Sequence, residues 1–277
     1  MYDILINMIK TILTGGMSKD LIKILKINPS TNPAYSDIWD QVVNFHTNTI
    51  IPIAIFLVVL YFVIDLAESG TMGMNTPEKI LSSCIKMLVA IFFVLNSLQL
   101  FADLWAIGIK LVDKFSVAFS KIDDAKLTAK ADRALGAIIN VAEGQSVEDA
   151  LAKMKFYNVL GVLVSLILPY LLSYVSSIFI MATAYSRLIQ LILRIVFAPI
   201  GMSDIYTNGF GGAGGRYVKS FFGVALQGAL VIVSVGIINA LSVAVASTGL
   251  TGSTVVSLVG LGVVMKSQSL AREIVGA

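Results

Sequence analysis

An all-α, polytopic helical membrane protein is predicted by the composition of this 277-residue chain and by the length of its apolar runs. Hydrophobic residues make up 57% of the sequence and charged residues only 13%, whereas a soluble domain is nearer half apolar and a quarter charged. The mean hydropathy is +0.87. Several apolar runs approach the roughly 20 residues that a helix needs to cross a bilayer. We expect about five transmembrane helices, or about six if a short C-terminal run also spans.

Catalytic, cofactor and metal sites are not expected. The chain contains one cysteine, Cys84, and one histidine, His46, so it cannot build a disulfide framework or a zinc site by itself. We place Cys84 in an apolar helix as a small buried side chain, and His46 at the surface or the membrane interface. A Ser–His pair would have to use His46, and the acids are scattered. The net charge of +3 is too small to indicate nucleic-acid binding by itself.

The N-terminal region, residues 1–47, begins with two short amphipathic helices. Apolar residues recur at helical spacing in the first helix, and lysines line one side of the second. Each helix is too short to cross ~30 Å of hydrocarbon. Two placements stay open: the helices lie in the headgroup plane of the bilayer, or they pack on the transmembrane bundle.

The first two transmembrane helices are expected within residues 48–112. The first span runs from about Thr49 to Ile64. Thr76-Pro77-Glu78 predicts the start of the next helix, because proline is favoured at the first helical position. The second span then covers about Ile80 to Phe101.

Three polar residues interrupt the second span. Lys86 lies near one end, where a lysine can extend its ammonium group towards the interface. Asn96 and Gln99 lie deeper. We expect both to hydrogen-bond to neighbouring helices, an interaction worth about 0.6–2 kcal/mol.

Residues 113–155 are expected to form an extramembrane helical segment. Acidic and basic residues are balanced in this part of the chain, and apolar residues keep one helix face. Ser146-Val-Glu-Asp149 resembles a capping box and predicts the start of a further helix.

The core transmembrane bundle is expected within residues 156–247. Phe156 to Ile200 is a predominantly apolar run, long enough for two spans, and we place the turn between them near Ala182 to Arg187. A further span covers about Phe221 to Ala246. The C-terminal part, residues 248–277, has a short apolar segment from Val255 to Met265 that is either re-entrant, interfacial or a sixth helix.

Small residues predict close helix packing in the last long span. Gly236, Ala240 and Ala244 recur every four residues, which places them along one side of a helix and lets another helix approach closely. Gln227 lies in the same span, and we expect it to face protein rather than lipid.

Charged residues gather around the loop between the last two long spans. Arg187 and Arg194 are seven residues apart, about two helical turns, so they share one helix face. Pro199 then ends the helix, and Asp204 follows as a lone acid. Arg216 and Lys219 begin the next span. We hypothesise that Asp204 forms an ion pair with Arg194 or Arg216, because an unpaired charge at membrane depth is costly; a solvated aspartate is the alternative.

The glycine-rich loop within this stretch matches a dinucleotide-binding pattern only in its letters. Gly209-Phe-Gly211-Gly-Ala-Gly214 has the glycine spacing, but a membrane helix precedes it and no acid follows about twenty residues later. We interpret it as a flexible loop without a cofactor.

The residues from 156 to 247, a third of the chain, resemble a known family. The matching positions are Ser186-Arg187, Arg194, Phe197-Ala-Pro199-Ile-Gly201, Asp204, Tyr217-Val-Lys219-Ser-Phe221 and Ala225-Leu-Gln227-Gly228. This order is similar to that of the TrbL-like family, the polytopic inner-membrane subunit of bacterial type IV secretion and conjugation systems.

The resemblance implies a structural channel subunit in the bacterial cytoplasmic membrane, a homo-oligomer around the channel axis. The implied partners are secretion ATPases, a surface-exposed component, the lipid bilayer and transferred single-stranded DNA in transient contact. The family places the N-terminus and the central segment outside and the C-terminus inside, whereas counting positive charges in loops favours the reverse. A secondary transporter is the alternative function, although no internal repeat of the kind that transporters have is visible.

Overall fold

A computed structural model describes residues 2–14, 19–71, 76–119, 124–141, 145–245 and 250–276. Of these residues 92% are helical, and none is in a β-strand. The all-α prediction is therefore confirmed, together with its polytopic character, because several helices are long and apolar enough to cross a membrane. The predicted junction between the two N-terminal helices lies outside the described residues.

The chain forms two compact units, each assembled from three separate stretches. Unit 1 contains residues 1–26, 112–185 and 229–267. Unit 2 contains residues 27–111, 186–228 and 268–277. The predicted regions are successive parts of the chain, whereas each compact unit combines parts of several of them.

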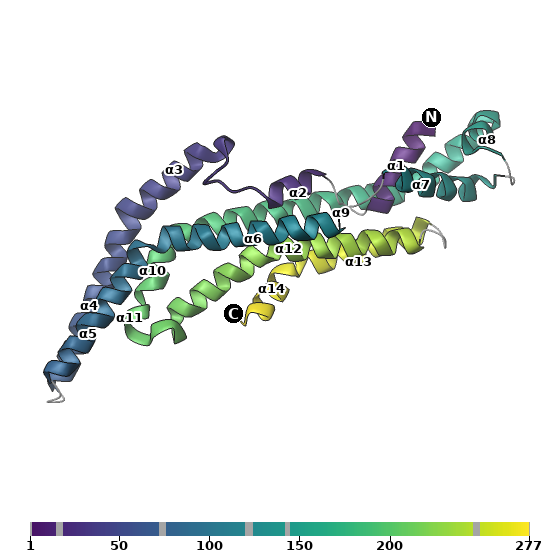
Figure 1. Ribbon diagram of the computed structural model, residues 1–277. Coiled ribbons are helices and arrows are strands. Elements are labelled where there is room, and N and C mark those ends of the chain that lie inside the picture. The colour runs from purple at the N-terminus through teal and green to yellow at the C-terminus, as the bar shows by residue number, and fades with distance from the viewer. Residues whose placement is uncertain are drawn as a thin grey trace. The chain divides into compact units, whose positions relative to one another are not determined.

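Unit 2 is built around a helical hairpin. Its elements are η1 (Pro33–Tyr35), α3 (Ser36–Phe45), the π turn η2 (His46–Ile50), α4 (Ile51–Thr71), α5 (Pro77–Leu95), the first part of α6 (Ser97–Phe119), the last part of α9 (Phe156–Val196), α10 (Ala198–Ser203), α11 (Ile205–Asn208), η3 (Gly209–Gly211), the first part of α12 (Ala213–Val245) and α14 (Ser267–Val275). Helices α4 and α5 lie side by side (Figure 1), and α10 packs against both. Thr76 caps α5 and Pro77 is its first residue, as the sequence predicts.

Unit 1 contains α1 (Tyr2–Thr14), α2 (Lys19–Leu25), the end of α6, α7 (Asp124–Ile139), α8 (Val147–Lys153), most of α9, the second part of α12 and α13 (Leu250–Met265). The apolar face of α1 is buried in a core that it shares with α7, α8 and α9. For α1, the structure therefore favours packing on other helices. Ser146 caps α8 by accepting a hydrogen bond from the Asp149 amide, which confirms the predicted helix start.

The spans differ from those predicted in two places. Helix α9 is continuous for 41 residues, so the predicted turn near Ala182 to Arg187 is wrong. Length is the only signal for that turn, and residues 182–187 contain no glycine or proline to end a helix. The predicted second span is not one straight helix, because α5 and α6 meet at Asn96 with a bend of 57°.

Asn96 and Gln99 each hydrogen-bond to a residue four positions away along the chain, so the predicted bonds to neighbouring helices are wrong. Asn96 Nδ2 donates to the carbonyl of Phe92 (2.8 Å), and Gln99 Nε2 donates to Asp103 Oδ1 (3.0 Å). An asparagine side chain that competes for a backbone carbonyl favours a helix end, and Asn96 is the C-terminal cap of α5.

Within the described residues, three helices can each cross a membrane by length and composition: Pro33–Thr71, Phe156–Val196 and Ala213–Ser242. Two bent helix pairs raise the number to as many as five. In the last of the three, 67% of the most apolar window is buried, against 17% and 22% in the other two. Helix α12 is therefore the most enclosed of the three, whereas α4 and α9 expose apolar side chains.

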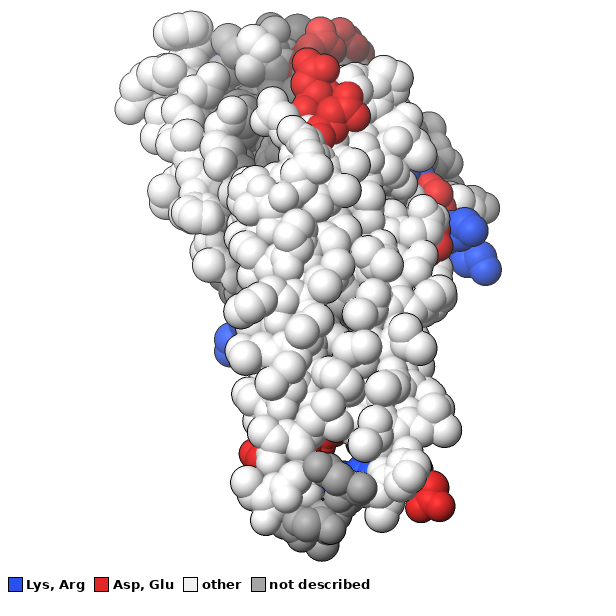
Figure 2. All heavy atoms as spheres, turned by 90° about the vertical axis from the view of Figure 1, so that its left-hand side faces the viewer, with Lys and Arg blue, Asp and Glu red and all other residues white. Residues whose placement is uncertain are grey.

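An apolar surface covers the side of the molecule that carries α3, α4 and α5. Figure 2 shows a broad area with few charged side chains, which lie mainly along its margins. Exposed leucine, isoleucine, valine and phenylalanine side chains line α4 and α5 there. A surface of this kind is suited to contact with lipid.

Candidate functional site

The break between α9 and α10 brings together much of the stretch singled out in the sequence. Pro199 lacks an amide hydrogen, so the carbonyl of Ile195 has no helical partner four residues ahead. His46 Nδ1 donates a hydrogen bond to this carbonyl (3.0 Å). The Tyr217 hydroxyl donates to the preceding carbonyl, that of Arg194 (2.6 Å). Side chains from α12 and from the π turn thus donate hydrogen bonds to the backbone carbonyls at the helix end that Pro199 creates.

His46 is fully buried, so its predicted place at the surface or the interface is wrong. It begins the π turn that precedes Pro52, whose ring cannot continue a regular helix without disturbing the turn before it. Its Nε2 atom lies 3.3 Å from Ser97 Oγ, at the start of α6. The imidazole of His46 therefore lies where three helix interruptions come together: the π turn, the bend between α5 and α6, and the break between α9 and α10. Cys84, predicted to be buried, is partly exposed.

Arg187 is buried, with 3% of its surface exposed, and binds the backbone of α12. Its Nε donates to the carbonyl of Val224 (3.1 Å) and its Nη2 to the carbonyl of Ala225 (3.0 Å). Gly228 makes this approach possible, because a Cβ atom at that position would lie 2.6 Å from Arg187 Cζ. The guanidinium joins α9 to α12 through the space that the glycine leaves.

The predicted ion pair of Asp204 with Arg194 or Arg216 is wrong for the described residues: no oxygen of Asp204 lies within 4.0 Å of either guanidinium. Arg194 Nη1 instead donates to Ser220 Oγ (2.7 Å). Asp204 Oδ2 accepts from the amides of Ala213 (2.6 Å) and Gly214 (3.3 Å). The first amides of a helix are good partners for a carboxylate, so Asp204 caps α12.

Three glycines of the glycine-rich loop are closely packed, whereas nothing lies within 4 Å of a Cβ atom added at Gly209 or Gly211. A Cβ atom at Gly212 would overlap the side chains of Asp204 and Asn208, and one at Gly215 would overlap the Phe210 backbone. At Gly214 it would lie 2.8 Å from Ile205 Cγ1. Because these three glycines have no side chains, the chain has room to fold back against the start of α12.

The remaining predicted residues divide between the interior and the surface. Gln227 is 3% exposed, in agreement with its expected position against protein. Arg216 and Lys219 are exposed near the start of α12. Gly236 is buried, whereas Ala240 and Ala244 are exposed, so only the glycine of this series is enclosed within the chain.

A second polar cluster, not predicted from the sequence, surrounds Asp65. Its Oδ2 atom accepts hydrogen bonds from Ser83 Oγ (2.6 Å) and from the Tyr206 hydroxyl (2.8 Å). These residues belong to α4, α5 and α11. The signal available in the sequence was an acid at the end of the first apolar run and a lysine, Lys86, in the second.

A cavity of about 170 Å³ opens beside this cluster, lined by Tyr61, Ile64, Asp65, Glu68, Lys86, Tyr206 and Thr207. It contains two carboxylates, one ammonium group and two phenols. Burial, and secondarily the hydrogen bond to Asp65, raise the pKa of Tyr206 to about 12. The Tyr206 phenol is protonated at neutral pH and donates its hydrogen bond to Asp65.

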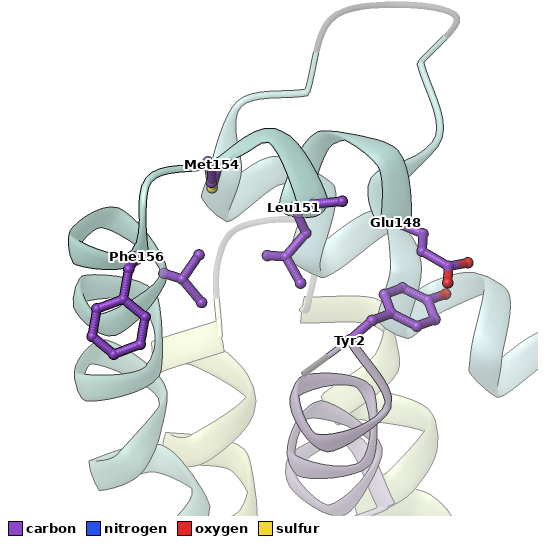
Figure 3. A pocket seen from close by; sticks show the side chains of 7 residues that line it. Tyr2, Glu148, Leu151, Met154 and Phe156 are labelled. Carbon is purple, nitrogen blue, oxygen red and sulfur yellow. The ribbon is translucent and has the colours of Figure 1, made fainter.

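A larger cavity, about 360 Å³, lies in unit 1 between α1, α8 and the start of α9. Figure 3 shows the oxygen atoms of Tyr2 and Glu148 close together on one side and Phe156 on the other. The Tyr2 hydroxyl donates to Asp132, and this bond is the main cause that raises the pKa of Tyr2 to about 12. Most of the other lining residues are apolar.

Metal binding finds no support in the part of the chain that the structure describes, where no three His, Cys, Asp or Glu side chains gather closely enough. No protein-family model, curated protein or solved structure matches the chain. The junction around Pro199 and the polar cluster around Asp65 are the features of the described residues that bear most directly on function.

Proposed function

We propose that this chain is a structural membrane subunit of a conjugative type IV secretion channel in a bacterial cytoplasmic membrane. In this role it scaffolds the path for DNA or protein transfer and catalyses no reaction. Several copies surround the channel axis, and ATPases and a surface-exposed component bind the assembly.

One observation carries the proposal: residues of the stretch that resembles the TrbL-like family bond α9 to α12. Arg187 binds the α12 backbone beside Gly228, and Tyr217 binds the carbonyl of Arg194. Asp204 caps α12, the helix that carries both Gly228 and Tyr217. The motif thus has a structural purpose, which is to join α9 to α12, and that suits a scaffold better than a catalyst.

The exposed cations beside this junction provide a contact for a transferred strand. Arg216 and Lys219 are exposed and near the start of α12. Exposed cations along a path attract a phosphate backbone without regard to base sequence. Because neither side chain makes a hydrogen bond or ion pair with the described residues of the junction, we expect both to be replaceable without unfolding the protein.

The proposal is tested by plasmid transfer from donor cells. Cells without the gene for this chain should fail to transfer a conjugative plasmid, and the wild-type gene should restore transfer. The double variant Arg216→Gln/Lys219→Gln should transfer less DNA at a normal protein level in the membrane. Lys114→Gln, an exposed lysine on α6, is the matched control. Normal transfer by the deletion strain would refute the proposal.

A solute transporter is the second candidate, and the cavity beside Asp65 is the observation that favours it. Carboxylates within membrane helices commonly mark ion or substrate paths. The two functions differ in their readout. A transporter would support uptake of a solute into cells or vesicles that contain only this protein, and Asp65→Asn would reduce that uptake while plasmid transfer stayed normal.

A further inference from the structure

We propose that the cavity beside Asp65 binds the headgroup of a phosphatidylethanolamine-type lipid, a phosphate joined to a primary ammonium. This inference is independent of the proposed function. It depends on the charges that line the cavity, on their separation and on the apolar surface that surrounds them.

The carboxylates and the lysine ammonium that line the cavity do not form ion pairs with each other. Asp65 uses Oδ2 for both of its hydrogen bonds, and Oδ1 has none within the described residues. Glu68 lines the same cavity. Lys86 also lines it but lies more than 4.0 Å from both carboxylates, since no ion pair forms among these three described residues. A ligand with both charges can bind the ammonium of Lys86 and the carboxylate of Asp65 together.

The surroundings of Lys86 indicate a lipid rather than a free solute. Lys86 is exposed on α5 beside Ile85 and Leu88, which are 53% and 62% exposed. On an apolar helix surface of this kind, an ammonium group finds its anion among lipid phosphates. Tyr61 and Tyr206 belong to the same lining, and tyrosine is enriched at the level of the headgroups. The acyl chains can then lie on the exposed apolar faces of α4 and α5.

The size of the cavity and its net charge narrow the choice of headgroup. A volume of about 170 Å³ holds on the order of ten water-sized groups, which is enough for an ethanolamine phosphate. Two carboxylates against one lysine disfavour an anionic lipid such as phosphatidylglycerol. A choline headgroup has no N–H to donate to Asp65 Oδ1, whereas a primary ammonium has three donors of the lysine type. Phosphatidylethanolamine is therefore the expected occupant.

Lipid retention by the intact detergent-solubilised protein tests this assignment. The protein is titrated with short-chain phosphatidylethanolamine, phosphatidylglycerol and phosphatidylcholine, and bound lipid is counted by native mass spectrometry. We expect wild-type protein to retain phosphatidylethanolamine at least about tenfold better than the other two, as the loss of a charge-assisted hydrogen bond implies. Asp65→Asn and Lys86→Gln should each remove this preference.

Matched controls on α6 are Asp103→Asn and Lys110→Gln, which replace an exposed acid and an exposed lysine away from the cavity. Both should keep the preference. Tyr206→Phe removes one hydrogen bond from Asp65 without a change in charge, so it should weaken the preference in protein that remains folded. Equal retention of the three lipids by wild type would overturn the proposal. So would binding of water-soluble phosphoethanolamine as tight as that of the lipid, since it would identify a free solute as the ligand.

Discussion

The contact between Arg187 and Gly228 makes the sharpest prediction of stability, and Gly228→Ala is the change that tests it. A Cβ atom at position 228 would lie 2.6 Å from Arg187 Cζ, whereas an ordinary contact is 3.4–4 Å. The guanidinium must therefore move by roughly 1 Å, since this is the gap between an overlapping and an ordinary packing distance. Its bonds to Val224 and Ala225 are 3.1 Å and 3.0 Å long, so such a movement breaks one or both.

The magnitude follows from these two bonds. A hydrogen bond to a charged group contributes about 1.5–3 kcal/mol, and a buried donor left without its acceptor is destabilising by a similar amount. Replacing a helical glycine by alanine returns about 0.5–1 kcal/mol. We expect Gly228→Ala to lower the free energy of unfolding by about 1–4 kcal/mol, which corresponds to a fall in melting temperature of roughly 2–8 °C for a chain of this size.

Thermal unfolding of the purified protein in one detergent is the assay. Gly161→Ala in α9 is the matched control, because nothing lies within 4 Å of its added Cβ atom. It should melt at the wild-type temperature or slightly above. Adding Arg187→Met to Gly228→Ala should recover part of the loss, because the flexible apolar side chain needs no carbonyl partners. If Gly228→Ala melts together with the control, Arg187 does not hold α12 in the way described.

Three further changes test other parts of the structure. Asp204→Ala should lower the free energy of unfolding by about 1–2 kcal/mol and Asp204→Asn by much less, because asparagine still caps a helix; equal losses in chemical unfolding would contradict the capping role. Gly260→Ala should destabilise by about 1–3 kcal/mol, since its Cβ atom would overlap Ile238, whereas Gly262→Ala meets nothing and should not; identical melting curves would be inconsistent with this packing. Subtracting the phenolate absorbance titration of Tyr206→Phe from that of wild type should reveal a tyrosine with a pKa near 12. Because the folded pKa exceeds the ordinary value of about 10, stability is retained below pH ~10 and lost as the pH rises towards 12, and a difference curve centred near 10 would refute the assignment.

Local signals in the sequence predicted the helices and several of their ends. Apolar composition indicated membrane-crossing helices, and Thr76-Pro77 and Ser146 marked helix starts that the structure contains. These features depend on a residue and its neighbours within about one helical turn. Length alone was a weaker guide, and the predicted turn inside α9 is absent because no local residue breaks the helix there.

Partners of the polar residues were decided only by the tertiary structure. His46 binds a carbonyl 149 residues away, and Tyr206 binds Asp65 across 141 residues. Arg187 has its acceptors 37 and 38 residues further along the chain. The residues next to a buried polar group in the sequence do not predict its hydrogen-bond partner, because every amide and carbonyl of a neighbouring helix is a candidate. The choice depends on which helices pack together and where a proline leaves a carbonyl unbonded or a glycine leaves room for a guanidinium.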